Sequence, residues 1–523
     1  MLVVDYISNF LKFHGITTVF GYQGGNISYM VDSIVRNGMN FVENYNEQAS
    51  SFAANSFAEI SYSFGVAISS SGPGAINMLN GIANAYYDGI PCLYITGDVN
   101  TAFRQKYKGV RQSEFQEVNI VRMAAPITKK CFQVENADEI PSILNEAVQI
   151  MFADRKGPVL INLAHNIQKS EVHFVEDYEI ISKEKLQTKG NVEDVISTEL
   201  EKSKNPVILL GNGCRNSVSS IRIFLERTKI PFASTLKALD IYPKSPHYLG
   251  FAGNYGTDDA NNALINADLI IVLGARLDVR VISAISNFED KRIIHIDVDK
   301  FELDKHRAVA YYRFQKRIED ILFDNIQYHN SIPVIQRTTV EENETLNFRS
   351  FFSRLKTNQS TIFTLDVGLH QMAGARYIPL KDDDRILSSG GLGSMGYSLP
   401  ASIGAYYADT SKKILSISGD GGIQMNLQEL ETIRREKLPI HVFVMNNKCL
   451  GMIRQYQDFA FNKRHYATVE GFSSPDYEKL SATFGFKYTH LTSVDQIEKC
   501  ISELENLNIP SFTEVDIPIN DNF

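Results

Sequence analysis

Two apolar, strand-like segments in the last third of the chain each end in residues that can bind a metal ion. Residues 413–419 run into a Gly-Asp-Gly-Gly turn that contains Asp420, and residues 441–445 run into an Asn-Asn pair that ends at Asn447. Parallel strands of one sheet present their carboxyl ends at the same edge, where ligands usually bind. The Asp420 carboxylate and the Asn447 carboxamide are therefore expected to converge.

Such a pair of side chains is suited to a magnesium-bound diphosphate. Carboxylate, carboxamide and backbone oxygens are ligands that Mg²⁺ accepts together with phosphate oxygens, and we include the backbone carbonyl of Cys449. A helix predicted from about Met425 would offer its N-terminal amides to the phosphate. Either element alone is more often an ordinary turn or strand end, but the two at this spacing favour a diphosphate site.

A separate acid, Glu47, stands before an alanine-rich helical stretch, and residues 71–74 read Ser-Gly-Pro-Gly. Alone, Glu47 would be read as a solvated acid at a helix start. Together with the Asp420 and Asn447 motif, these segments resemble the thiamine diphosphate (ThDP)-dependent decarboxylases and carboligases along nearly the whole chain. The resemblance implies that Glu47 acts on the cofactor's pyrimidine ring to activate it, and that Glu47 and Asp420 of one active site come from different chains of a homo-oligomer.

The same resemblance implies a set of cofactor-binding residues on this chain. For ThDP they are Glu47, Pro73, Asn77, Gly393, Met395, Gly419, Asp420, Gly421, Gly422, Asn447, Gly451 and Met452, with Asp420, Asn447 and the Cys449 carbonyl on Mg²⁺.

Several segments resemble acetolactate synthases in particular, among them 115–117, 366–372, 391–396 and 451–457. The resemblance gives catalytic roles to Gly25, Gln116 and Met395 besides Glu47. It places Phe115, Arg280, Ile453 and Tyr456 in the substrate pocket, with Arg280 on the acceptor's carboxylate. Core packing is the alternative for Met395, Phe115 and Met452, and a surface ion pair with Asp278 is the alternative for Arg276 and Arg280.

The implied reaction is decarboxylation of pyruvate, with ThDP as electron sink, followed by transfer of the hydroxyethyl unit to an acceptor carbonyl. Three positions depart from the synthase pattern: Gln23, Val279 and Tyr456. The sequence also ends at Phe523 without the carboxyl-terminal extension of anabolic synthases, so we expect a more open site. The alternative reactions are transfer of the two-carbon unit to a nucleotide-linked keto-sugar or another aldehyde or ketone, and simple decarboxylation of a 2-oxoacid.

A central region resembles the FAD-carrying version of this architecture. Its possible FAD-binding residues are Thr235, Leu236, Gly253, Tyr255, Gly274, Arg276 and Asp297. The resemblance implies FAD in a structural role. A Gly-Asp pair that holds the adenine side in the family is missing where residues 310–315 stand.

The elements that must position these residues alternate between strand-like and helical patterns, which favours parallel sheets covered by helices. We predict an α/β protein of three consecutive doubly wound domains. They are a ThDP pyrimidine-binding domain over 1–168, a central FAD-binding-like domain over 190–327 and a ThDP diphosphate-binding domain over 346–523, separated by polar linkers.

The composition of the chain argues against some classes of binding partner. The formal net charge of -9 and the absence of a basic stripe argue against nucleic acid, and a small-molecule 2-oxoacid substrate is more natural. No apolar run is long enough to span a membrane, and no targeting segment is recognised. The odd number of cysteines, 5, favours a reducing compartment, so we expect a cytoplasmic protein.

Overall fold

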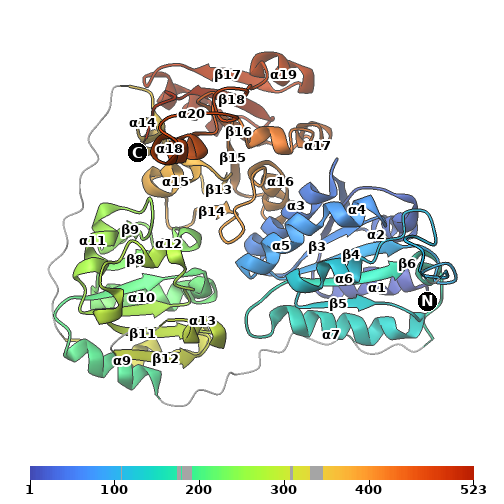
Figure 1. Cartoon of the computed structure of the whole chain (residues 1–523), viewed down its shortest axis with the longest axis horizontal. Coiled ribbons are helices and arrows are strands. Elements are labelled where there is room, and N and C mark those ends of the chain that lie inside the picture. The colour runs from blue at the N-terminus through green and yellow to red at the C-terminus, as the bar shows by residue number, and fades with distance from the viewer. Residues whose placement is uncertain (108, 174–177, 179–190, 307–309, 330–344, 523) are drawn as a thin grey trace.

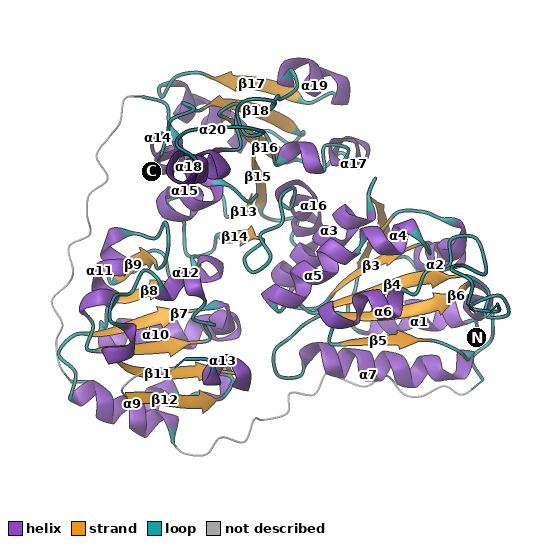
Figure 2. Cartoon of the chain, in the orientation of Figure 1, coloured by secondary structure: helices purple, strands orange, loops and turns teal. Residues whose placement is uncertain are grey.

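The protein consists of three α/β units, each built on a six-stranded sheet (Figures 1 and 2). The computed structural model describes residues 1–107, 109–173, 178, 191–306, 310–329 and 345–522. Every strand pair in the three sheets is parallel. The predicted fold class is therefore confirmed. Among the described residues, no helix combines the length and the apolar character that crossing a membrane requires.

The first unit has the strand order β2-β1-β3-β4-β6-β5. Its strands are β1 Thr18–Gly21, β2 Asn40–Glu43, β3 Gly65–Ser69, β4 Cys92–Asp98, β5 Lys130–Gln133 and β6 Val159–Ala164. Its helices are α1 Val3–Phe13, α2 Ser28–Arg36, α3 Glu47–Ser61, α4 Pro73–Asn77, α5 Leu79–Asp88, α6 Ile120–Ala124, α7 Ile140–Phe152 and α8 His165–Gln168.

The middle unit has the order β12-β11-β10-β7-β8-β9, which, read from β9, is the order of doubly wound sheets that bind dinucleotides. Its strands are β7 Pro206–Leu210, β8 Phe232–Ser234, β9 Tyr248–Phe251, β10 Leu269–Leu273, β11 Arg292–Asp297 and β12 Ala310–Gln315. Its helices are α9 Val192–Glu201, α10 Val218–Thr228, α11 Asp258–Asn266, α12 Val279–Ile282 and α13 Lys300–Asp304.

The third unit repeats the order of the first, as β14-β13-β15-β16-β18-β17. Its strands are β13 Thr361–Leu365, β14 Arg385–Ser388, β15 Lys413–Gly419, β16 Ile440–Asn446, β17 Lys487–Leu491 and β18 Ser511–Asp516. Its helices are α14 Phe348–Arg354, α15 Leu369–Tyr377, α16 Ser398–Ala408, α17 Glu429–Arg435, α18 Gly451–Ala460, α19 Tyr477–Phe484 and α20 Gln496–Glu505.

The first and third units pack together through α3 and α16, and one apolar core runs through both (Figure 1). Most of α3 is buried, and its residues are mainly alanine and serine. A Cβ on Gly404 of α16 would lie 1.9 Å from the Ala53 carbonyl oxygen, and one on Gly81 of α5 would lie 2.1 Å from Ser51 Cβ. Small side chains therefore let α3 lie almost in backbone contact with its neighbours.

The sequence placed the strands around the candidate sites close to their observed positions, but one helix prediction is wrong. The turn at 419–422 is followed by a short 3₁₀ segment, Ile423–Met425, and α17 begins only at Glu429. Asn426 leaves the helical backbone conformation, which interrupts the helix expected from Met425. The predicted linkers fall largely outside the described residues, and the exact domain bounds stay predictions.

We expect Gly404→Ala to destabilise the protein by about 3 kcal/mol or more, because the added methyl group would force the backbones of α16 and α3 apart. Gly374→Ala in α15 is the matched control. Its Cβ would meet only side-chain carbon atoms, the nearest 3.0 Å away, so we expect a change within about 1 kcal/mol. The midpoint of denaturant-induced unfolding measures both, and equal midpoints for the two variants would contradict the close-packing argument.

Candidate active site

The structure brings Asp420 and Asn447 together at the carboxyl ends of neighbouring strands. In the pairing of β15 with β16, Gly419 lies opposite Met445, and the Asp420 N–H donates to the Met445 carbonyl at 3.3 Å. Asp420 is 2% exposed, and its Oδ2 has no hydrogen-bond partner among the described residues. A buried carboxylate oxygen without a partner is costly unless it binds something, so this atom fits a metal ligand.

Burial raises the pKa of Asp420 to about 7, although the backbone N–H groups of Lys448, Gly421 and Cys449 act in the opposite direction. The two strand-end segments therefore converge on one carboxyl group. Asn447 is also buried, and its Oδ1 accepts from the Cys449 N–H at 3.4 Å. The donor set of carboxylate, carboxamide and a nearby backbone carbonyl fits Mg²⁺.

Glycines in the 419–422 turn allow neighbouring side chains to pack closely against it. A Cβ on Gly421 would lie 2.4 Å from Leu450 Cδ2 and 3.6 Å from Met395 Cε. Met395, one of the predicted catalytic residues, thus lies against this turn. Gly393 has a φ of +72° with open space around it, as suits a chain segment that passes a ligand.

Two buried residues at this edge were not singled out from the sequence, although both lie in the 366–372 segment. Asp366 is fully buried and accepts the Gly396 N–H at 2.9 and 3.0 Å, which fixes the segment that carries Met395. His370 is buried, and its Nε2 has no partner among the described residues. Its ring lies 3.0 Å from where a Cβ of Gly419 would be, so His370 belongs to the candidate site.

Glu47 is the first residue of α3, and its carboxyl is held inside the first unit. The Asn46 side chain caps α3 by accepting the Gln48 N–H at 2.8 Å. Asn77, the last residue of α4, donates to Glu47 Oε2 at 3.0 Å. A Cβ on Gly74 would lie 2.8 Å from Glu47 Oε1, so the glycine is needed there.

Pro73 occupies the first position of α4, directly before Gly74. The α3 and α4 residues thus form a second cluster. No hydrogen bond or ion pair joins Glu47 to the 419–422 turn within the part of the chain that the structure describes.

The other predicted catalytic and pocket residues lie on more open segments. Gly25 is exposed at the start of a 3₁₀ turn, and Gln116 has a φ of +64° and packs against Gly72. Phe115 is 78% exposed, and Tyr456 on α18 is 59% exposed. Ile453, Gly451 and Met452 lie on the same helix as Tyr456. Such exposed apolar side chains are expected where another surface covers them.

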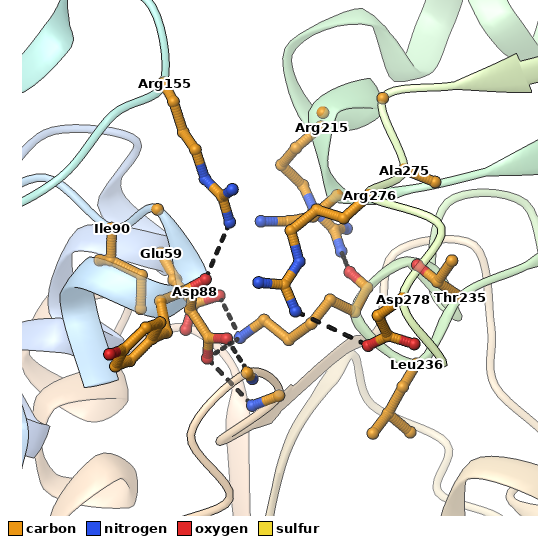
Figure 3. Close-up of a pocket in the computed structure, with 18 of the residues that line it drawn as sticks. Glu59, Asp88, Ile90, Arg155, Arg215, Thr235, Leu236, Ala275, Arg276 and Asp278 are labelled. Atoms are coloured by element: carbon orange, nitrogen blue, oxygen red, sulfur yellow. Dashed lines mark hydrogen bonds and ion pairs between the residues drawn. The ribbon is translucent and has the colours of Figure 1, made fainter. Parts of the chain in front are cut away.

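A cavity of about 430 Å³ lies between the three units, and all seven candidate FAD residues line it. Figure 3 shows Thr235, Leu236 and Arg276 among them. Asn212, just after β7, and Gly274, just after β10, line the cavity. The strand order of the middle sheet reverses between these two neighbouring strands. Gly393 and Met452 also line it, so the cavity reaches the candidate ThDP residues. The position and lining of the cavity suit a dinucleotide.

Charged side chains that the sequence did not reveal form one wall of this cavity (Figure 3). Lys237 Nζ lies 2.7 Å from Glu59 Oε1 and 3.6 Å from Asp88 Oδ2, and it donates to the Ser388 carbonyl at 2.9 Å. Burial lowers the pKa of Lys237, but the two carboxylates outweigh burial and raise it. This lysine therefore ties the middle unit to the other two.

A buried ion triad lies beside it. Asp240 accepts Arg215 at 2.6 Å and Arg385 at 2.9 Å, and the Asp240 side chain is 0% exposed. Burial opposes ionisation of Asp240, but the two guanidinium groups lower its pKa below the usual value. The triad joins the middle unit to the start of β14 in the third.

Arg276 and Arg280 both pair with Asp278, at 3.6 and 2.8 Å. The ion pair considered from the sequence is thus present, while both arginines also line the cavity. Figure 3 shows the pair of Arg276 with Asp278. Arg280 is half exposed and donates to the Gly390 carbonyl at 3.0 Å. The two interpretations of these arginines are therefore compatible.

Comparison with protein-family models assigns all three units. The N-terminal TPP binding domain of thiamine pyrophosphate enzymes matches residues 1–123, their central domain matches 194–322, and their C-terminal TPP binding domain matches 366–515.

Individual relatives match over nearly the whole chain. The acetolactate synthase isozyme 2 large subunit of Escherichia coli is 32% identical over 98% of this chain and 95% of its own length. A probable acetolactate synthase large subunit of Methanocaldococcus jannaschii is 33% identical over 97% and 90%. The acetolactate synthase large subunit of Lactococcus lactis is 33% identical over 92% and 86%.

We expect Asp240→Asn to destabilise the protein by about 3–5 kcal/mol at neutral pH, because it leaves two buried arginines without their counter-charge. Because the pKa of Asp240 is lowered in the folded protein, its contribution is complete above the unfolded value of about 4 and is lost as the pH falls further. Unfolding curves at several pH values measure this. Asp258→Asn, at an exposed ion pair with Arg376, is the control and should change stability by less than about 1 kcal/mol.

Proposed function

Because this chain belongs to the thiamine pyrophosphate enzymes, and among them to the acetolactate synthase large subunits, we propose roles for its site residues in a decarboxylating carboligation. The chain is a ThDP-dependent enzyme that condenses pyruvate, and its relatives do not favour the keto-sugar or simple decarboxylase alternatives. The observation that carries the residue roles is the buried Asp420 oxygen without a partner, beside Asn447.

Asp420, Asn447 and the Cys449 carbonyl hold Mg²⁺, and through it the diphosphate of ThDP. The unpartnered Asp420 Oδ2 and the convergence of the two strand ends support this assignment. Glycines 419, 421 and 422 let the side chains of His370, Leu450 and Asp366 pack against the turn, and His370 offers an unpartnered ring nitrogen nearby.

When bound, ThDP supplies a carbon nucleophile and an electron sink for the decarboxylation of a 2-oxoacid. Glu47 holds a proton at the cofactor's pyrimidine ring, and Asn77 orients its carboxyl through Oε2. Met395 supports the cofactor between the turn and Gly393. Gln116 and Gly25 face the reacting carbonyl from the first unit.

The acceptor is a second 2-oxoacid, whose carboxylate Arg280 binds with its planar guanidinium. The half exposure of Arg280 and its position on the cavity wall support this role. Phe115, Ile453 and Tyr456 line the pocket for the apolar end of the acceptor.

The active site lies between two copies of the chain in a homo-oligomer. Among the described residues of one chain, no hydrogen bond joins Glu47 to the 419–422 turn, and Phe115, Tyr456 and Phe459 are more than half exposed. A second copy would cover these side chains and bring Glu47 to the metal-bound cofactor. The five unpaired cysteines fit the cytoplasmic location that we also propose.

Labelled pyruvate tests the reaction directly. With ThDP and Mg²⁺, we expect CO₂ and acetolactate from pyruvate alone, and mixed products when other 2-oxoacids are added. A panel of aldehydes and keto-sugars should compete poorly with pyruvate as acceptor. Release of acetaldehyde without a ligated product would instead assign the chain to the decarboxylases.

Mixed oligomers test the shared site. We expect Glu47→Gln and Asp420→Ala each to abolish most turnover when present in both chains. If each site takes the two residues from different chains, a randomly reassembled mixture regains about a quarter of wild-type activity, because half the dimers are mixed and each contains one intact site. No recovery in a mixture shown to contain mixed dimers would place both residues of a site on one chain.

FAD fills the cavity between the three units in a structural role. The strand order of the middle sheet and the seven lining residues support it. Burial raises the pKa of Asp297 to about 6, and the Asp297 carboxyl is well placed at the end of β11 to accept a ribose hydroxyl. The strand β12 lies where the family's Gly-Asp pair is missing, so the adenine side is held differently.

We expect the purified protein to show a flavin absorption band, with about one flavin per chain after extraction. Arg276→Ala should lower flavin occupancy severalfold because it removes a cation from the cavity wall. Arg313→Ala, at an exposed position on β12, should leave occupancy unchanged. Protein that neither contains nor takes up flavin would rule out FAD in this cavity.

A further inference from the structure

A buried carboxyl group from the third unit holds the segment that leads into α3. Glu429, the first residue of α17, is 0% exposed. Its carboxylate accepts the Asn44 Nδ2 amide at 2.8 Å and the Tyr45 N–H at 2.9 Å, and Thr432 Oγ1 donates to it at 2.8 Å. Hydrogen bonds between a carboxylate and buried donors are among the stronger ones in proteins.

The same face of α17 makes further contacts with this segment. Thr432 Oγ1 lies 3.4 Å from the Glu43 carbonyl oxygen, to which the Arg435 guanidinium also donates. The Arg435 guanidinium lies over the Tyr45 ring, 5.4 Å from its centroid. Residues three apart in a helix share a face, so one side of α17 holds three consecutive residues of the first unit.

The segment held in this way ends two residues before Glu47. Tyr45 is followed by Asn46, whose side chain caps α3 at the Gln48 N–H, and Glu47 is the first helical residue. A shift of Tyr45 would therefore move Glu47 as well, because only the capping residue Asn46 lies between them. Asn77 contacts that carboxyl on one side only, through Oε2.

The residues directly before α17 contact the metal-diphosphate turn and the segment that contains Met395. Gln424 Nε2 donates to the Asp420 carbonyl at 2.8 Å, and Asn426 Nδ2 donates to the Gly396 carbonyl at 2.8 Å. The Glu429 N–H donates to the Asn426 carbonyl at 3.0 Å. Residues 424–429 thus connect the turn to the helix face that holds the segment before Glu47.

We propose that Glu429 is a positioning residue for the reaction, which acts by holding residues 43–45 and thereby the Glu47 carboxyl at the start of α3. The proposal rests on the role of Glu47 proposed above. Since Glu47 of one chain serves the cofactor held by the other, the contact also links the two active sites of a dimer.

Glu429→Gln tests the proposal, because a glutamine keeps the shape but replaces one acceptor oxygen with an NH₂ group that faces the Asn44 or Tyr45 donor. With bound ThDP and Mg²⁺, we expect exchange of the cofactor's C2 proton with deuterium oxide to slow by about tenfold or more, as follows from misplacing a proton-transfer group. The value of kcat should fall similarly, whereas KM for pyruvate and Kd for ThDP should change by less than about threefold.

The matched control is Glu431→Gln on the same helix, where the carboxylate is partly exposed and pairs with Arg434. It should leave the exchange rate unchanged. The double variant Glu429→Gln with Asn44→Asp exchanges donor and acceptor across the contact and keeps one buried carboxylate. It should restore most of the exchange rate, which a general loss of structure would not predict.

The outcomes separate this inference from the proposed role of Glu47. If Glu47→Gln leaves C2 exchange unchanged, the role of Glu47 itself fails. If Glu47→Gln slows exchange but Glu429→Gln does not, Glu429 is not a positioning residue. Equal losses of ThDP affinity and exchange rate, without recovery in the double variant, would likewise overturn the proposal. Should Glu429→Gln not fold, Asn44→Ala removes a single donor and gives the same comparison.

Discussion

The close packing of α3 is the constraint on which the rest of the structure depends. Its alanines and serines let α5 and α16 approach so closely that glycines are required at Gly81 and Gly404. Larger side chains between α3 and α16 would separate the first and third units, since buried interfaces tolerate little added volume. The apolar core that the two units share, and hence the relative placement of their sites, follows from this single contact.

The two ends of α3 belong to different sites. Glu47 begins the helix on the thiamine side, and Glu59, near its other end, pairs with Lys237 on the cavity wall. At a rise of 1.5 Å per residue, the backbone positions of Glu47 and Glu59 lie about 18 Å apart along the helix axis. An almost fully buried helix thus sets the separation between Glu47 and the cavity wall at Glu59.

Much of this arrangement could be predicted from the sequence, for identifiable reasons. Apolar runs ending in Asp420 and Asn447 predict parallel strands with polar residues at one edge, because sheet pairing places those ends together. No such signal marked Asp240, Lys237 or Glu59, because isolated charged residues usually lie on the surface. Their ion pairs form only through the tertiary packing of the three units. The helix expected from Met425 failed where Asn426 leaves the helical conformation, which periodicity alone does not reveal.

The repeated strand order of the first and third sheets gives the α3 and α16 contact a further meaning. Each of these helices follows the second strand of its own unit and leads into the third, so they are equivalent elements of one fold. Equivalent surfaces that meet each other are the mark of a twofold, isologous interface. Within one chain, two units of the same strand order thus meet through equivalent helices, and the dinucleotide-type unit lies between them in the sequence.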